Sequence, residues 1–86
     1  MDIIIVNKDL PFEVELAGGG GFIRRVLVHH KGEFYVISEN TALKETLIFS
    51  ASPTGEVTNW NEVGGGGGLT VEEVLKDFEQ FLYGYF

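Results

Sequence analysis

A run of five glycines precedes an apparent helix start in the stretch VGGGGGLTVEE, residues 63–73. Glycine-rich loops at a helix N-terminus can cradle phosphate groups with their backbone amides, provided that a lysine and a hydroxyl follow the glycines. Here the run is followed by Leu69 and Thr70, and Glu72 and Glu73 occupy the turn where an anion would dock. We therefore interpret the glycines at 18–21 and 64–68 as flexible loops, and we predict no nucleotide or other cofactor.

The other reactive residue types do not form a catalytic or metal-binding pattern. His29 and His30 are adjacent, so on a strand their rings point to opposite faces and cannot chelate one ion together. The chain has no cysteine, which excludes disulfides and thiolate zinc sites, and no serine lies in a Gly-x-Ser-x-Gly elbow. We expect the histidines at the surface or at a sheet edge, and we predict no catalytic residue, no metal and no enzymatic activity.

Carboxylates and aromatic side chains are the stronger candidates for binding. Thirteen acidic residues against six basic ones give a net charge of -7, which repels nucleic acid phosphates and attracts a basic partner, including a nucleic-acid-binding protein. The alternatives are that the acidity serves solubility and that the aromatic tail packs on the sheet. The candidate partner-binding residues are the acids Glu13, Glu15, Glu72, Glu73, Asp77 and Glu79, and the aromatics Trp60, Tyr83, Tyr85 and Phe86.

Strand patterns occupy the chain before the second glycine run. Apolar runs or strict apolar–polar alternation predict strands at 3–6, 12–16, 22–30, 34–38, 45–50 and 57–60, with turns at 30–33 and 52–55. The glycines at 18–21 predict a hairpin in which Ala17 faces Phe22, so that Glu15 lies opposite Arg24. Strands at this spacing favour an antiparallel meander.

After the second glycine run, the apolar period changes to that of a helix. One continuous stripe is formed by Val71, Val74, Leu75, Phe78, Phe81 and Leu82. Thr70 and Glu73 make a capping box, and Gly84 is a plausible C-terminal cap. We predict a single α+β domain over 1–86, with an antiparallel β-meander sheet of four to six strands and one C-terminal amphipathic helix packed on one face. The N-terminus lacks a basic signal-peptide region and no stretch approaches ~20 apolar residues, so we expect a cytoplasmic protein without membrane contact.

Two stretches resemble known families. Residues 45–63, ETLIFSASPTGEVTNWNEV, look like the ETLVF…GEVTxWxEV block of short uncharacterised proteins of actinobacterial phages, in which a glycine-containing stretch and an acidic helix follow. More distantly, 12–18 (FEVELAG), 26–28 and 34–39 (FYVISE) are similar to the three-stranded sheet of a small acidic anti-CRISPR inhibitor of Cas9. That resemblance implies mimicry of nucleic acid by an acidic turn at 30–33, where Glu33 keeps the charge and Lys31 replaces an acid, and it adds Glu33 to the candidate partner-binding residues.

These observations predict a small acidic phage accessory protein that binds a host or phage protein in the host cytoplasm without catalysis. Two alternatives stay open. The first is a self-associating structural or virion-related domain, which would form a homo-oligomer through the aromatic tail and a sheet edge. The second is a DNA-mimic inhibitor of the anti-CRISPR type.

Overall fold

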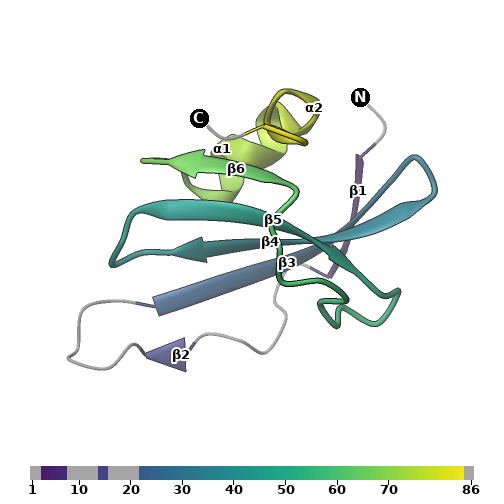
Figure 1. Cartoon of the computed structure of the whole chain (residues 1–86), viewed down its shortest axis with the longest axis horizontal. Coiled ribbons are helices and arrows are strands. Elements are labelled where there is room, and N and C mark those ends of the chain that lie inside the picture. The colour runs from purple at the N-terminus through teal and green to yellow at the C-terminus, as the bar shows by residue number, and fades with distance from the viewer. Residues whose placement is uncertain (1–2, 8–13, 16–21, 85–86) are drawn as a thin grey trace.

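The computed structural model describes residues 3–7, 14–15 and 22–84, which form an antiparallel sheet followed by two short helices (Figure 1). This arrangement confirms the predicted α+β class. The sheet has six strands in the order β1-β3-β4-β5-β6, with β2 also paired to β3. The elements are β1 (Ile3–Asn7), β2 (Val14–Glu15), β3 (Phe22–His30), β4 (Glu33–Asn40), β5 (Glu45–Ala51), β6 (Gly64–Gly67), α1 (Val71–Lys76) and α2 (Phe78–Phe81).

The central hairpin of β3 and β4 lies where strands were predicted at 22–30 and 34–38. Lys31 and Gly32 form its turn with φ values of 48° and 82°, and this pair of positive angles is the two-residue geometry that matches strand twist. The register then runs from the His30–Glu33 pair to the Ile23–Asn40 pair. The turn therefore fixes which side chains of β3 and β4 share a face.

The predicted hairpin register between 12–16 and β3 is wrong by two residues. Glu15 pairs with Phe22 and Val14 with Ile23, whereas Arg24 pairs across the other edge of β3 with Glu39, its guanidinium 3.4 Å from the carboxylate. A run of glycines has no side-chain pattern that shows where the loop begins and ends. The register between the two strands is therefore determined by their pairing in the sheet and could not be predicted from the glycines. The loop predicted at 18–21 lies outside the described residues.

The loop predicted at 64–68 is also wrong, because Gly64–Gly67 is strand β6 and pairs antiparallel with β5. On its other side, Gly64 bridges Leu82, and the Val63 carbonyl accepts a hydrogen bond from the Tyr83 amide. A Cβ atom at Gly64 would overlap the Phe81 carbonyl oxygen. The glycines therefore allow backbones to approach more closely than any side chain would permit.

The strand predicted at 57–60 is absent: Val57 makes only an isolated bridge to Ala51. The Asn59 side chain accepts a hydrogen bond from the Asn61 amide at 3.0 Å, a local turn that competes with strand pairing. The turn predicted at 52–55 is present, with the Gly55 amide 3.0 Å from the Ser52 carbonyl oxygen.

The continuous helix predicted over 71–82 is instead two helices separated at Asp77, whose φ and ψ are -144° and 54°. The predicted capping box of Thr70 and Glu73 is confirmed. The predicted cap at Gly84 is wrong, because Tyr83 takes the left-handed conformation with a φ of 62°. The break redirects the chain so that Leu82 can reach Gly64.

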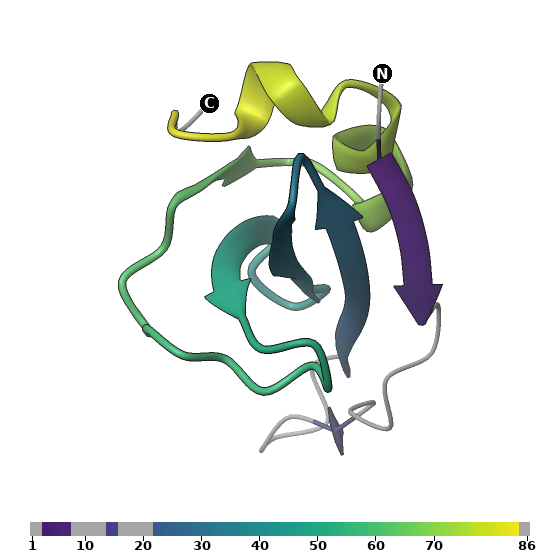
Figure 2. The same ribbon diagram turned by 90° about the vertical axis from the view of Figure 1, so that its right-hand side faces the viewer.

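The main core joins the helices to the sheet, and Figure 2 shows α1 and α2 along one side of the curved strands. Its fully or nearly buried members are Val26, Val28, Tyr35, Ile37, Ile48, Val71, Val74 and Phe78. A smaller cluster around Leu27 and Val36 lies separately and includes Phe34, Ala51 and Val57. Since Val36 and Ile37 are neighbours on β4, the two clusters occupy opposite faces of the sheet.

Candidate functional site

The predicted partner-binding residues do not form one surface. Glu13, Tyr85 and Phe86 lie outside the described residues, and Glu15 is placed only by its pairing with Phe22 in the sheet. The structure distributes the others among three places: the end of the β3–β4 hairpin, the exposed side of the helices, and the sheet face that carries Trp60.

Three of the predicted residues, Glu33, Glu79 and Tyr83, meet around one hollow of about 370 Å³. The β3–β4 turn brings Glu33, helix α2 brings Glu79, and the segment after α2 brings Tyr83. We call this hollow the turn pocket; its lining consists of His30, Lys31, Glu33, Tyr35, Glu79, Leu82 and Tyr83. Because these residues come from distant parts of the sequence, the pocket exists only in the folded chain.

Glu79 links the helix to the turn. Its carboxylate lies 3.7 Å from Lys31 Nζ and 3.8 Å from His30 Nε2. The His30 ring is buried, only 3% exposed, and meets the Phe78 ring edge-on at a centroid distance of 5.2 Å. The surface position expected for His30 is therefore wrong, because helix α2 covers it.

His29 lies on the opposite face of β3, as the strand periodicity predicts. Its ring stacks on Phe34 with centroids 4.6 Å apart. The two histidine rings therefore have different partners on different faces, and they form no common metal site. Among the described residues, no group of three or more His, Cys, Asp or Glu side chains could hold a metal ion.

Two tyrosines form one wall of the turn pocket. The Tyr35 and Tyr83 hydroxyl oxygens are 3.4 Å apart, with Tyr35 buried at 5% exposure and Tyr83 exposed at 74%. The pKa of Tyr35 is raised to about 12, chiefly by burial and to a smaller degree by the hydrogen bond to Tyr83 and by the charges of Tyr83 and Glu33. Tyr35 therefore stays a neutral phenol at physiological pH.

The charge of the turn pocket is negative on balance. Glu33 is exposed, and none of the described residues forms an ion pair with it, whereas Glu79 shares its charge with Lys31. The lining thus holds two carboxylates and one ammonium group beside an exposed aromatic ring. This arrangement suits a cationic group with an apolar stem better than an anion.

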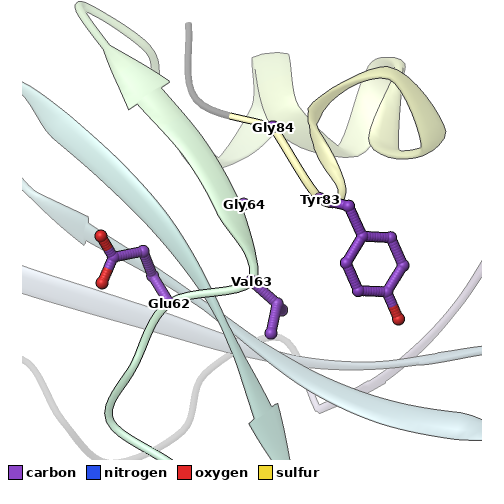
Figure 3. Close-up of a pocket in the computed structure, with 5 residues that line it drawn as sticks. All are labelled: Glu62, Val63, Gly64, Tyr83 and Gly84. Atoms are coloured by element: carbon purple, nitrogen blue, oxygen red, sulfur yellow. The ribbon is translucent and has the colours of Figure 1, made fainter.

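Tyr83 also borders a second hollow of about 380 Å³, lined by Glu62, Val63, Gly64, Tyr83 and Gly84. Figure 3 shows the Glu62 carboxylate and the Tyr83 ring pointing away from each other at opposite sides of this hollow. Its lining is mostly backbone and apolar surface, and its polar side chains do not converge. The turn pocket is therefore the better candidate site.

Two of the remaining predicted acids, Glu72 and Glu73, have side-chain partners within the fold. Glu72 accepts two hydrogen bonds from the Arg24 guanidinium, at 3.2 and 3.0 Å. Glu73 accepts from the Thr70 amide in the capping box, and Asp77 stands at the junction of α1 and α2. The contacts of Glu72 and Glu73 are therefore explained by folding.

Trp60 lies with Phe49, whose side chain belongs to the face opposite the main core. The two rings meet edge-on at 5.3 Å, and the Arg25 guanidinium carbon lies 5.4 Å from the centre of the Trp60 ring. Burial lowers the pKa of Arg25. Trp60 and Tyr83 are thus not parts of one aromatic patch.

Four residues of the turn pocket were not predicted from the sequence as binding residues: His30, Lys31, Tyr35 and Leu82. The stretch His30-Lys31-Gly32-Glu33 was a usable signal, since a two-residue turn at Lys31 and Gly32 places His30 opposite Glu33. The approach of α2 to this turn had no comparable signal in the sequence.

No protein-family model, curated protein or solved structure matches this chain. No helix in the described part of the chain is long and apolar enough to cross a membrane.

Proposed function

We propose that this protein is a small accessory protein of the phage type that residues 45–63 resemble, and that it binds a basic host or phage protein in the host cytoplasm without catalysis. In this proposal the helices pack on one face of the sheet and hold their acids outward. The partner contacts the turn pocket and the adjacent acidic surface of the helices.

One observation carries the proposal: Glu33, Glu79 and Tyr83 were selected separately from the sequence, and they line the same hollow. A negative, partly aromatic concavity of this kind complements a cationic side chain. An exposed aromatic residue beside charged groups is also typical of the centre of a protein interface.

The test compares partner capture by the wild-type protein with capture by a Glu33→Gln/Glu79→Gln variant. Proteins captured from host lysate are identified and purified, and their affinity is measured by calorimetry at low and raised salt. We expect the double variant to bind at least about 10-fold more weakly, because charge-assisted contacts are lost, and raised salt to weaken the wild-type complex.

Glu56→Gln is the control, since Glu56 is exposed in the turn after β5 and does not line the turn pocket, and the substitution removes one charge. It should leave the affinity unchanged. A purified partner that binds the wild type and the double variant equally well would contradict the proposal.

Trp60 supports a second candidate, the self-associating structural domain, because its side chain is 62% exposed beside Phe49 and Arg25. Light scattering over a range of concentrations separates the two candidates, since a strict monomer excludes self-association. The DNA-mimic alternative has less support, because Lys31 brings a cation into the turn that would need to be acidic and pairs there with Glu79.

A further inference from the structure

We infer that the turn pocket receives the guanidinium group of an arginine side chain. This inference rests on the proposed function, because the arginine belongs to the bound partner, and it specifies the chemistry that the pocket selects. Three features of the pocket support it: the negative charge, the exposed Tyr83 ring, and the Tyr35 and Tyr83 hydroxyl groups, which can accept hydrogen bonds.

The charge selects a cation. Glu33 lies exposed at the rim and has no ion-pair partner among the described residues, while the Lys31 ammonium lies 3.7 Å from Glu79. A bound monovalent cation would therefore balance the one carboxylate that the turn leaves without a countercharge. An anion would have to approach both carboxylates and is disfavoured.

The shape and lining select a planar cation with an apolar stem. The Tyr83 ring is largely exposed, and Leu82 adds apolar surface at the same wall. A guanidinium group stacks on an aromatic face, and its methylene stem covers apolar surface. The volume of about 370 Å³ lies at the small end of the range for ligand pockets, which suits one side chain and not a large cofactor.

The acceptors favour arginine over lysine. Guanidinium carries five donors in a fixed fork that matches a carboxylate with two parallel hydrogen bonds. Glu33 can receive such a pair, and the Tyr35 and Tyr83 hydroxyl oxygens, 3.4 Å apart, offer acceptors for further donors. A lysine ammonium is more strongly hydrated and cannot make the paired contact or stack on the ring.

The experiment is a titration of the isotope-labelled full chain with three blocked pentapeptides, Ser-Gly-X-Gly-Ser, followed by amide chemical shifts. X is arginine, lysine or citrulline, the neutral analogue of arginine. We expect the arginine peptide to shift the amides of Gly32, Glu33 and Tyr83, with an affinity at least about threefold higher than that of the lysine peptide. The citrulline peptide should cause no saturable shift, since it lacks the charge.

Two variants locate the site. Glu33→Gln should weaken the arginine peptide at least about fivefold, and Glu56→Gln should leave its affinity unchanged. Equal binding of arginine and lysine peptides, shifts confined to other parts of the chain, or no binding of the arginine peptide at all would overturn the inference.

The outcome is separable from that of the proposed function. If a partner is captured through Glu33 and Glu79 while the arginine peptide does not bind, the arginine pocket is wrong and the binding function stands. If the arginine peptide binds at the turn pocket but no captured partner depends on these carboxylates, the proposed function fails and the pocket chemistry stands.

Discussion

Two of the three non-glycine residues with positive φ among the described residues border the turn pocket. These are Lys31 at 48° and Tyr83 at 62°, and the third is Lys44 at 53°. A side chain in the left-handed region costs about 1–2 kcal/mol, and such outliers often occur at binding sites. At Tyr83 this conformation accompanies a ring that is exposed and not buried in the core, which is consistent with a role in recognition.

Tyr35 provides a test of the pocket's electrostatics through its ionisation. Its folded pKa of about 12 exceeds the ordinary value of 10.0, so the folded state keeps the proton at a pH where the unfolded state has released it. The resulting stabilisation is complete below about pH 10 and is lost as the pH rises from 10 to about 12. When phenolate absorbance is followed as the pH is raised, one tyrosine should therefore ionise near pH 12, well above the ordinary value of 10.0.

The assignment is checked by two substitutions. Tyr35→Phe should remove the late phase, and Tyr83→Phe should lower the pKa of Tyr35, because it removes a hydrogen-bond partner and a charge. A titration in which every tyrosine ionises near pH 10 would show that the Tyr35 hydroxyl is not buried in the pocket wall.

Among the contacts between elements, a carboxylate of the sheet, Glu39, accepts a hydrogen bond from the first residue of helix α1. Glu39 of β4 is 7% exposed, and its Oε1 atom accepts a hydrogen bond from the Val71 amide at 3.0 Å. The first amides of a helix lack partners within the helix, so this contact satisfies a buried donor. The Arg24 guanidinium lies 3.4 Å from the same carboxylate and also binds Glu72 of α1, which connects the sheet to the helix.

We expect Glu39→Ala to lower the free energy of unfolding by about 2–4 kcal/mol, because it leaves the buried Val71 amide without its acceptor and removes one of the two carboxylates that the Arg24 guanidinium contacts. Glu72→Ala removes an exposed partner of the same guanidinium and should cost less than about 1 kcal/mol. Urea unfolding of both variants measures the difference. Similar losses for the two would show that Glu39 does not secure the helix.

The close packing of strand β6 against residues 81–83 leads to a second prediction. Gly64→Ala places a methyl group against the Phe81 backbone, so we expect a loss of at least about 2 kcal/mol and faster hydrogen exchange at the Tyr83 amide. Gly68→Ala is the control: its φ is 73° but the space around it is open, so only conformational strain of about 1 kcal/mol is added. A Gly64→Ala protein as stable as the control would show that the tail does not pack against β6.

For the molecule as a whole, the elements that the sequence predicts are those marked by short runs of apolar side chains. The segments at 34–38 and 45–50 form β4 and β5, since apolar runs bounded by turn residues are typical of strands buried in a sheet. Strand β6 could not be predicted in this way, since glycines have no apolar side chains. The apolar stripe over 71–82 is continuous, yet the backbone turns at Asp77, because the bridge between Leu82 and Gly64 is a tertiary contact.

The same distinction applies to the site. Charge and aromatic content selected Glu79 and Tyr83, and the family resemblance selected Glu33, but their meeting depends on the β3–β4 turn and on the position of α2. Trp60 was selected on the same grounds and lies with Phe49 instead. Residue type thus predicts which groups can bind, and the long-range pairing of strands and helices decides which of them act together.

The number of glycines at 64–68 also determines the distance along the chain between Val63 and Leu69. Strand β6 has no side chains that could fix its register, so its alignment with β5 depends on the residues at its two ends. The Val63 amide donates a hydrogen bond to the Ile48 carbonyl at 2.7 Å. The Leu69 carbonyl accepts a hydrogen bond from the Thr46 hydroxyl at 2.6 Å. Both Val63 and Leu69 also pack against the main core. Five glycines connect Val63 to Leu69, so a chain with four or six glycines would have to break the contacts of one of these two residues. The number of glycines therefore matters as well as their small size.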